Sequence, residues 1–355
     1  MDPSGRIEGS ASRPHFLVIK LSSLGDLFHA LPAVQTLQVA RQAVVDWVAQ
    51  PEYTDLVACF GGIRRVIPFP RRQFGAAMLP FLRALRAERY DVILDFQGLL
   101  KSALVSRLAR GNLRLGPSFA REGTRVFYSR LAGERRRDRH AIDECLDFTD
   151  ALGIPRGEGR PILPFRFPPF PMPKDAPRPR IAVSPVTRWA SKNWPLRHLT
   201  HVLQLLGQRI GGSFHLIGGA MDRTLYEGVG LSLSRPVYNW AGTLSLPELG
   251  SLLAQMDLMI ASDTGPMHMA AALSVPVVAA FGPTDPGRTG PYGTPARVVV
   301  KEGLPCRPCF QRRCRLDEEA PPCLRDLDPG AVVEAAVTLL SSILGREGER
   351  PNERK

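Results

Sequence analysis

The middle of the chain contains a proline-rich segment that divides it in two. Nine prolines fall within the 26 residues from Pro155 to Arg180. Proline has no N–H to donate and clashes in a helix interior, so this segment can form neither a helix nor a central strand. Because 355 residues also exceed what one core usually holds, we predict two domains of roughly 150 residues each. We place them at residues 14–154 and 180–328, joined by a linker over 155–179.

Both halves alternate between short apolar runs and helical patterns of apolar residues. In the first half this predicts strands over 15–20, 44–48, 65–68 and 91–95, and helices over 27–37, 75–88 and 99–109. In the second half it predicts strands over 180–184, 214–217, 258–261 and 275–281, and helices over 195–209, 222–231, 246–254 and 266–273. A final amphipathic helix is expected within 329–345, with disordered tails over 1–13 and 346–355. This alternation is typical of α/β domains with doubly wound parallel sheets.

The composition is that of an ordinary soluble protein, with 44% apolar and 23% charged residues. No apolar run approaches the roughly 18 residues of a membrane span. The first 13 residues are small and polar and lack the apolar centre of a secretory signal, which favours the cytoplasm. Six cysteines are too few for a disulfide scaffold in a chain of this length, so we expect reduced thiols unless they bind metal.

Positive charge is concentrated in one segment of the first half. Between Gly61 and His140 there are 18 Lys or Arg and 6 Asp or Glu, an excess as large as the net charge of +12 of the whole chain. Such a segment favours an anionic partner: nucleic acid, an acidic membrane surface or a phosphorylated substrate. An arginine-rich proteome would be a simpler explanation of the same composition.

The loop after the first predicted strand lacks the usual nucleotide-binding signatures. No G-x-G-x-x-G follows that strand and no G-x-x-x-x-G-K-[ST] occurs in the chain, which argues against dinucleotide oxidoreductases and P-loop phosphotransferases. The sequence Ser-Ser-Leu-Gly-Asp stands there instead, ending at Asp26. Gly25 permits a tight turn. Asp26 opens the next helix, where it could serve chemistry or simply stabilise the helix N-terminus as a capping or first-turn acid.

Two loops of the second half carry polar residues after apolar strands. The first, from Ser262 to His268, opens a helix with Pro266 in its first turn, which is typical of an anion site. Its Asp-Thr-Gly also occurs in aspartic proteases, but those need two carboxylates and this chain has one copy. The second loop, from Val186 to Pro195, supplies hydroxyls and a cation, or only a capped turn. Ligands of doubly wound sheets bind beyond the carboxyl ends of the strands, so we expect the site in these loops.

Five motifs stand in an order that is seen in one enzyme family. They are VIKLSSLGDLFHALPA from Val18, DFQGLLKS from Asp95, KNWP from Lys192, SDTGPMH from Ser262 and FGPTDP from Phe281. Together they resemble the ADP-heptose:lipopolysaccharide heptosyltransferases of glycosyltransferase family 9, most of all the heptosyltransferase I group, which adds the first heptose to the Kdo2-lipid A inner core. The resemblance implies a GT-B fold, two Rossmann-like domains facing a cleft, and an inverting transfer that requires no cofactor or metal.

The same resemblance assigns roles to individual residues. Asp26 would be the general base that removes the proton of the acceptor hydroxyl as this oxygen attacks the anomeric carbon. A helix N-terminus would lower the pKa of this carboxylate and weaken the base, and desolvation would offset that. The expected donor-binding residues are Thr187, Lys192, Leu244, Asp263, Thr264, Gly265 and His268, although a histidine at position 268 could also be a core residue. The expected acceptor-binding residues are Ser23, Gly25, Arg71, Arg72, Gln97, Lys101 and His140.

Four cysteines cluster in the predicted loop over 303–326. Their spacing is C-x2-C-x4-C-x8-C, at Cys306, Cys309, Cys314 and Cys323. Four thiolates at such spacing can hold a tetrahedral Zn²⁺ or an iron ion, while reduced free thiols are the alternative. The heptosyltransferase I group lacks this cluster, whereas the autotransporter heptosyltransferases, which modify protein, resemble it in having a cysteine-bound iron. The cluster therefore leaves the acceptor open.

The expected partners follow from the resemblance and from the basic segment. We expect ADP-heptose as the donor, Kdo2-lipid A as the acceptor, peripheral association with the anionic cytoplasmic face of the inner membrane, a monomer, and no nucleic acid. Exposed arginines such as Arg83, Arg86 and Arg89 could equally well only solvate the domain. One alternative keeps the donor but has another inner-core heptose or a protein as acceptor. Another is a basic nucleic-acid-binding module with a four-cysteine metal site.

Overall fold

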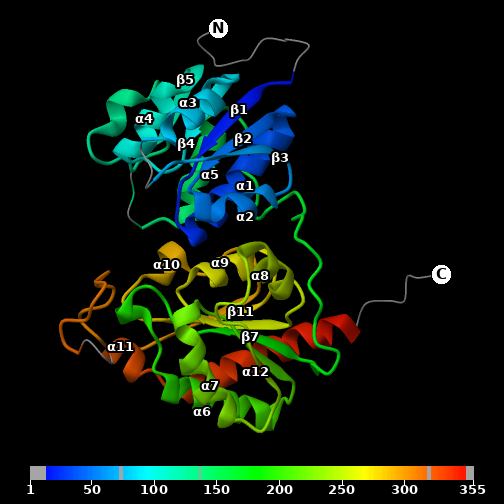
Figure 1. Ribbon diagram of the computed structural model, residues 1–355. Coiled ribbons are helices and arrows are strands. Elements are labelled where there is room, and N and C mark those ends of the chain that lie inside the picture. Colours follow the sequence, from blue (N-terminus) through cyan, green and yellow to red (C-terminus); the bar gives the residue numbers. More distant parts are fainter. Residues whose placement is uncertain (1–12, 72–74, 135, 137, 318–320, 349–355) are drawn as a thin grey trace. The chain divides into compact units, whose positions relative to one another are not determined.

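The computed structural model describes residues 13–71, 75–134, 136, 138–317 and 321–348 (Figure 1). The chain divides into two compact units with the boundary at Phe167 and Pro168, inside the proline-rich segment. Between Ala151 and Arg180 the described chain forms no helix or strand, as the prolines predict. Most of the two predicted tails, residues 1–12 and 349–355, lies outside the described residues, while residues 346–348 continue the last helix instead of beginning a tail.

The first unit is a six-stranded parallel sheet with helices on its faces. Its strands are β1 (His15–Ile19), β2 (Val44–Ala49), β3 (Ile63–Pro68), β4 (Arg89–Asp95), β5 (Arg110–Pro117) and β6 (Arg130–Ala132). Its helices are α1 (Leu24–Arg41), α2 (Thr54–Ala58), α3 (Met78–Arg86), α4 (Leu100–Leu108) and α5 (Ala141–Ala151). Helix α1 packs against α5, and α3 and α4 lie together on another side of the sheet (Figure 1).

The second unit repeats this plan. Its strands are β7 (Arg180–Ser184), β8 (Ser213–Leu216), β9 (Val237–Asn239), β10 (Leu258–Ser262), β11 (Val277–Phe281) and β12 (Ala296–Val300). Its helices are α6 (Leu196–Arg209), α7 (Arg223–Leu231), α8 (Leu246–Leu253), α9 (Gly265–Ala272), α10 (Pro286–Thr289), α11 (Pro322–Arg325) and α12 (Pro329–Gly348). Helix α12 packs against α6 and the sheet of its own unit. None of the helices in the described residues is long and apolar enough to cross a membrane.

Both sheets have the same strand order, with the first strand of each unit beside its fourth. The first sheet runs β3-β2-β1-β4-β5-β6 and the second runs β9-β8-β7-β10-β11-β12. In the first unit the chain adds strands outward from β1 to β3, and then returns to add β4 to β6 on the other side of β1. The second unit does the same from β7. The loops after β1 and β4, and after β7 and β10, therefore turn away from each other. In such a sheet the ligand site lies beyond the carboxyl ends of these two strands. The register puts Ile19 beside Asp95 and Ala261 beside Ser184, so the paired loops begin at one level.

The sequence did not reveal several elements near the sheet edges. Strand β5 has the sequence RGNLRLGP, in which charges and glycines obscure the alternation, and β6 and β9 have three residues each. Strand β12 and helix α5 were also not predicted, and α3 begins at Met78 instead of residue 75. Edge strands bury less of their surface than central ones, so they need fewer apolar residues. The central strands were all predicted.

The proline-rich segment is held to each unit by a glutamine side chain. Gln35 is buried in α1, and its Oε1 accepts hydrogen bonds from the backbone N–H groups of Ile162 at 2.7 Å and Leu163 at 3.0 Å. In the second unit, Nε2 of Gln255 donates to the carbonyl oxygen of Phe170 at 3.1 Å. These amides supply partners for backbone groups that have none within a helix or a sheet. The segment is thus fixed on both sides of the boundary.

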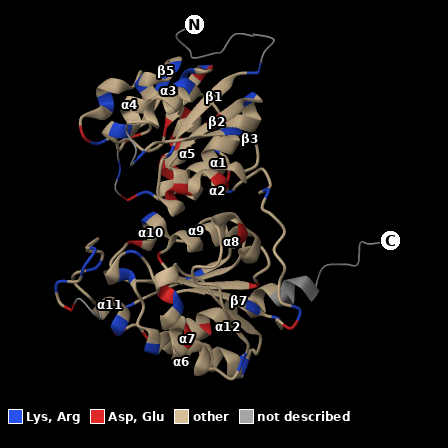
Figure 2. Ribbon diagram, viewed as in Figure 1, with Lys and Arg blue, Asp and Glu red and all other residues tan. Residues whose placement is uncertain are grey.

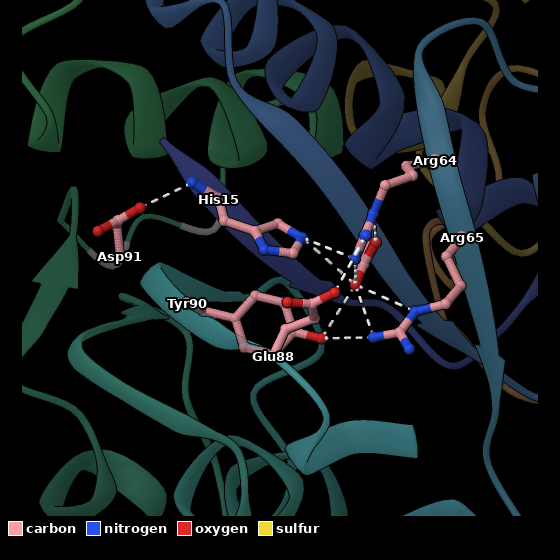
Figure 3. A network of polar contacts seen from close by, with 7 residues as sticks. His15, Arg64, Arg65, Glu88, Tyr90 and Asp91 are labelled. Atoms are coloured by element: carbon pink, nitrogen blue, oxygen red, sulfur yellow. Dashed lines mark hydrogen bonds and ion pairs between the residues drawn. The ribbon is translucent and has the colours of Figure 1, made fainter. Parts of the chain in front are cut away.

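A buried carboxylate ties together four strands at the amino-terminal half of the first sheet (Figure 3). Asp46 in β2 accepts hydrogen bonds from Arg64 and Arg65 in β3, each at 2.8 Å, and from the hydroxyl of Tyr90 in β4 at 3.0 Å. The Nε2 atom of His15 in β1 lies 3.4 Å from the same carboxylate. Burial alone would raise the pKa of Asp46, but the two guanidinium groups outweigh it and hold this pKa below its usual range.

Replacing Asp46 by Asn should destabilise the first unit, because both arginines then lose a charged partner at a buried position. We expect the free energy of unfolding to fall by about 2 kcal/mol in urea denaturation at neutral pH. The pKa of Asp46 is lower in the folded than in the unfolded chain, so its contribution is complete above about pH 4 and is lost as the pH falls through the folded value. The difference between the two proteins should therefore shrink in acid.

The matched control is Asp138→Asn, which removes a carboxylate paired with Arg136 where both side chains are exposed. It should leave the urea transition unchanged. Equal destabilisation by both substitutions would contradict the role given to Asp46.

Candidate functional site

The loop after β1 places Asp26 in the first turn of α1. Ser23 is the N-cap residue, and both its backbone N–H and its hydroxyl donate to Oδ2 of Asp26, at 2.7 and 2.8 Å. Asp26 is thus the first-turn acid of a capping box, which is the structural role foreseen for it. Its side chain nevertheless stays 43% exposed. The other oxygen, Oδ1, lies 3.9 Å from Nδ1 of His29, so one oxygen serves the helix start while the other takes no part in the capping box.

Buried positive charge controls the pKa of Asp26. Lys20 at the end of β1 is 6% exposed, and its Nζ donates to the carbonyl oxygen of Phe96 at 3.0 Å. Partial burial tends to raise the pKa of Asp26, but the charges of Lys20 and His29 and the hydrogen bonds of Ser23 outweigh it and lower the pKa below the ordinary value. The low pKa expected from the helix N-terminus is therefore present, and Lys20 is the largest of the groups that lower it. Asp26 is a carboxylate across the neutral range.

The loop after β4 fastens the loop after β1. Oε1 of Gln97 accepts hydrogen bonds from the backbone N–H groups of Leu21 at 3.1 Å and Ser22 at 3.2 Å. The N–H of Gln97 in turn donates to Oδ1 of Asp95 at 2.8 Å, and the hydroxyl of Tyr128 donates to Oδ2 at 2.7 Å. Burial raises the pKa of Asp95, and these hydrogen bonds offset the effect only in part. Gln97 therefore holds the backbone that carries Asp26.

The remaining candidates for acceptor binding differ in their contacts and in their exposure to solvent. His140 is the N-cap of α5, where its Nδ1 accepts from the N–H of Ile142 at 3.1 Å, and its ring lies edge-on to His29 with centroids 5.8 Å apart. Arg71 is exposed and donates to Oε1 of Gln50 at 3.3 Å. Gly25 is buried and Lys101 is half-buried. Arg72 lies outside the described residues.

In the second unit, Asp263 is the centre of the polar residues after β10. Its Oδ2 accepts from Nζ of Lys192 at 2.6 Å and from the hydroxyl of Thr284 at 2.7 Å. Its Oδ1 lies 3.6 Å from Nε2 of His268 in α9. Burial would raise the pKa of Asp263, but His268 and Lys192 reverse this and hold it well below its usual range. Loops that follow β7, β10 and β11 thus meet at one carboxylate.

Lys192 and Thr187 are fixed within the loop after β7. The ammonium of Lys192 lies 4.4 Å from the ring centroid of Trp189, a cation–π distance. The N–H of Thr187 donates to Oδ1 of Asn193 at 2.7 Å, and its hydroxyl donates to the carbonyl oxygen of Trp189 at 2.9 Å. The capped turn that the sequence allowed is therefore formed. It also holds Lys192 against Asp263.

The other candidates for donor binding divide into two groups. Thr264 is the N-cap of α9, its hydroxyl accepts from the N–H of Met267 at 3.3 Å, and Gly265 is the first residue of that helix. Both therefore adjoin Asp263. Leu244 is half-buried between β9 and α8, on the opposite side of β7 from β10. It therefore lies at the carboxyl ends of the strands of the same sheet, but apart from Asp263.

Four polar residues at these edges were not singled out from the sequence. Lys20 ends an apolar run and looked like the end of a strand, and His29 is three residues after Asp26, a spacing that places both on one helix face. Thr284 contacts Asp263 directly, and the hydroxyl of Thr289 lies 3.5 Å from the same carboxylate. Both threonines follow β11, whose carboxyl end lies beside that of β10. This position was the signal from which their proximity to Asp263 could have been predicted.

The cysteines of the 303–326 loop lie near one another without forming a coordination sphere. Cys323 is buried in α11, Cys309 and Cys314 are half-buried, and Cys306 is exposed. Burial, together with the charges of the other three thiols, raises the pKa of Cys323 to about 11. Within the described residues, no three His, Cys, Asp or Glu side chains are placed so that they could hold a metal ion. Residues 318–320 of this loop lie outside the described part.

Comparison with known proteins gives one consistent result. A model of glycosyltransferase family 9 (heptosyltransferase) matches residues 78–319. Lipopolysaccharide heptosyltransferase 1 of Pseudomonas aeruginosa is 30% identical, over 91% of this chain and 97% of the relative. Lipopolysaccharide heptosyltransferase 2 of Escherichia coli is 27% identical, over 80% of this chain and 87% of the relative.

A solved structure extends this result to the fold. The E. coli heptosyltransferase WaaC with ADP-2-deoxy-2-fluoro heptose matches 91% of this chain and 99% of its own, with 26% identity and a TM-score of 0.72. The GT-B fold expected from the sequence is confirmed. The roles of the individual site residues stay predictions.

Replacing Lys20 by Met should raise the pKa of the Asp26 carboxyl group, because the substitution removes the positive charge that lowers this pKa most. Carboxyl-carbon NMR titration of the full chain would measure this pKa. Lys101→Met, a change of the same type at the start of α4, should leave the titration of Asp26 unaltered. An unchanged pKa in Lys20→Met would assign the low value to Ser23 and His29 instead.

Proposed function

The chain belongs to glycosyltransferase family 9, the heptosyltransferases, and from this premise we propose that it transfers L-glycero-D-manno-heptose from ADP-heptose to the Kdo2-lipid A inner core of lipopolysaccharide. It is a glycosyltransferase. The observation that carries the proposal is the partly exposed Asp26 carboxylate, whose Oδ1 takes no part in the capping box. This carboxylate stands beyond the carboxyl ends of β1 and β4, held in place through its other oxygen by Ser23.

Asp26 is proposed to act as the general base. Oδ1 takes the proton of an acceptor hydroxyl while that oxygen forms a bond to the anomeric carbon of heptose. The bond from that carbon to the diphosphate breaks on the opposite face, and its electron pair leaves with ADP, so the configuration is inverted. Ser23 keeps the carboxylate oriented throughout, since it binds the oxygen that does not react.

The low pKa of Asp26 limits what this base can do early in the reaction. A carboxylate stabilised by Lys20 and His29 attracts a proton weakly from a neutral hydroxyl. The hydroxyl becomes acidic only as its oxygen bonds to the electron-poor anomeric carbon. The proton is therefore expected to move late, after the bond to ADP has largely broken, and the same low pKa keeps the base ionised at every physiological pH.

The polar residues around Asp263 are proposed to hold the diphosphate of the donor. Lys192 carries three N–H donors, so it can keep its contact with Asp263 and still donate to a phosphate oxygen. Thr264 and Gly265 open α9 and offer backbone N–H groups at a helix N-terminus. Thr187, Asp263 and His268 orient this cluster, and negative charge that develops on the leaving group meets the ammonium of Lys192.

The other predicted contacts complete the proposal. The resemblance assigns the backbone at Leu244 to the adenine ring of the donor. For the acceptor we propose the residues that surround the Asp26 loop: Ser23, Gly25, Arg71, Gln97, Lys101 and His140, with Arg72 outside the described residues. Their cations suit the carboxylates of Kdo and the phosphates of lipid A. An acceptor of this kind would place the enzyme on the cytoplasmic face of the inner membrane.

The choice of Kdo2-lipid A rests on the higher and longer similarity to heptosyltransferase 1. A second candidate, transfer to a heptose of the inner core, is favoured by the similarity to a heptosyltransferase 2. Release of ADP in the presence of each purified acceptor separates the two. Release with Kdo2-lipid A alone supports the proposal, and release only with a heptose-bearing core overturns its acceptor.

Asp26→Asn should lower turnover at least about a hundredfold, the usual scale for loss of a general base, with the dissociation constant of ADP-heptose nearly unchanged. Asn keeps an oxygen that can accept the hydrogen bond from the N–H of Ser23, so the start of α1 should persist. Steady-state kinetics and calorimetric titration with the donor measure the two quantities.

Asp222→Asn is the matched control, since Asp222 also accepts a backbone N–H at the start of a helical segment, from Gly219 at 2.8 Å. Its turnover should equal that of the unaltered protein. Loss of donor binding together with turnover in Asp26→Asn would give Asp26 a structural role only.

For the cysteines we propose a structural Zn²⁺ or iron ion held by Cys306, Cys309, Cys314 and Cys323, with no part in the reaction. The support is their spacing and the proximity of three thiols to Cys323. The thiols as described do not form the four-ligand set themselves, so binding would have to draw the loop together.

Elemental analysis of the purified protein should find about one metal ion per chain, and Cys309→Ser should lose it and lower the thermal midpoint. Cys59→Ser changes a buried thiol of the other unit and should retain the metal. Four freely titratable thiols without metal would overturn this proposal and leave the transferase proposal intact.

A further inference from the structure

Helix α4 presents its large apolar side chains to solvent and buries its small ones. Leu100, Leu104 and Leu108 are 43%, 44% and 42% exposed. They are four residues apart, so they line one face of the helix. The buried positions of α4 are occupied by Ser102, Ala103, Val105 and Ser106. A helix on the surface of a soluble protein normally has the reverse distribution, with leucines toward the core.

The small buried residues have a structural reason, and the exposed leucines have none within the unit. Val105 is part of the core beneath α3 and α4, together with Phe81 and Leu85 of α3. The hydroxyl of Ser102 donates to the carbonyl oxygen of Leu99 at 2.8 Å and stabilises the start of α4. Leu100, Leu104 and Leu108 are not part of this core. The leucine row therefore points to something outside the first unit.

Uncompensated positive charge surrounds the leucine row. In Figure 2 lysines and arginines are seen on α3, α4 and β5. Three of these guanidinium groups donate to neutral oxygens: Arg86 to the carbonyl of Leu108 at 3.0 Å, Arg110 to the carbonyl of Arg86 at 3.4 Å, and Arg89 to the side chain of Asn112 at 3.2 Å.

The rest of this surface is mainly positive, although the carboxylate of Glu122 accepts a hydrogen bond from the backbone N–H of Leu100 at 2.7 Å. In the described chain, no ion pair joins an acidic residue to any cation of α3, α4 or the starts of β4 and β5; these cations are Arg83, Arg86, Arg89, Lys101, Arg107 and Arg110. The nearby Glu88 is instead paired with Arg64 at 3.1 Å. The surface is therefore positive as well as apolar.

We propose that Leu100, Leu104 and Leu108, with these six cations around them, form a docking surface for an anionic lipid bilayer, which we call the α4 face. The combination of an apolar row with flanking Lys and Arg is what an anionic membrane interface binds: the leucines enter the boundary between headgroups and acyl chains, and the cations meet the lipid phosphates. The inference rests on the proposed function to the extent that the acceptor is itself a lipid.

The position of the α4 face agrees with a lipid acceptor. Helix α4 begins three residues after Gln97, which holds the loop of Asp26. Docking through α4 would bring this loop and Lys101 to the level of the lipid headgroups. An acceptor anchored by its acyl chains could then offer its sugar hydroxyl to Asp26 without leaving the bilayer.

Flotation with vesicles of phosphatidylethanolamine and phosphatidylglycerol tests the proposal. The full-length protein should float with these vesicles, less with phosphatidylcholine vesicles, and less at high salt. The triple substitution Leu100→Gln, Leu104→Gln, Leu108→Gln should weaken vesicle binding at least about tenfold, because three side chains lose apolar burial. Its thermal midpoint should not fall, since the replaced side chains are exposed.

A matched control changes three exposed leucines of the second unit to glutamine: Leu225, Leu231 and Leu316. It should bind the vesicles as the unaltered protein does. Binding by the α4 variant at full strength, or equal loss in both variants, would overturn the proposal. A dimer that the α4 variant dissociates, without any vesicle binding by the unaltered protein, would overturn it in favour of an interface between copies.

A second readout separates this proposal from the transferase proposal. With a deacylated, water-soluble Kdo acceptor the α4 variant should keep full turnover, whereas with acceptor embedded in vesicles it should lose about as much rate as it loses binding. No turnover of either acceptor by the unaltered protein would contradict the proposed acceptor and leave vesicle binding to be judged by flotation alone.

Discussion

The reversal of strand order at β1 and at β7 determines where every functional group of this protein can lie. At that point two neighbouring strands end at one level and their loops turn away from each other, which leaves room above the sheet. Asp26 and Gln97 come from such a pair of loops in the first unit, and Lys192 and Asp263 from the equivalent pair in the second. In the proposed function, the same topology positions the base in one unit and the diphosphate-binding cluster in the other.

Within the first unit, the proposed base is also part of the helix start. Asp26 closes the first turn of α1 through Oδ2, while Oδ1 takes no part in the capping box and lies 3.9 Å from Nδ1 of His29. The capping box leaves room for both interpretations of this acid, because the structural role uses one oxygen and the proposed catalytic role uses the other. Lys20 lowers the pKa of Asp26 and so keeps the carboxylate charged. In the proposed mechanism this carboxylate must stay ionised until the acceptor hydroxyl becomes acidic.

The sequence predicts the central strands well, because strands buried on both faces need continuous apolar runs and leave a clear pattern. It predicts the edge strands β6, β9 and β12 poorly, because they are short or half-exposed, and it misses β5, which lies between β4 and β6, because charges and glycines interrupt its apolar residues. For the site, the motifs located Asp26, Lys192 and Asp263, yet the partners that tune them depend on contacts across strands. Neither Lys20 beside Asp26 nor Thr284 on Asp263 could be paired by spacing alone, since 21 residues separate the latter two. The sequence likewise does not show that α4 exposes its leucines and buries its small residues, because this depends on which face of the helix packs against the sheet.

The glutamine contacts on the proline-rich segment have a consequence for internal motion. The backbone is secured up to Arg166, whose N–H donates to the carbonyl of Cys59 at 2.7 Å, and again from Pro168, whose carbonyl accepts from Ser251. Phe167 alone lies between these attachments, and it precedes two prolines whose φ angles are fixed and which restrict it to extended conformations. The chain thus has almost no torsional slack at the boundary. Any reorientation of the units would have to turn at Phe167 or first break the hydrogen bonds of Arg166 and Pro168. The two glutamines then limit how much more of the segment can detach.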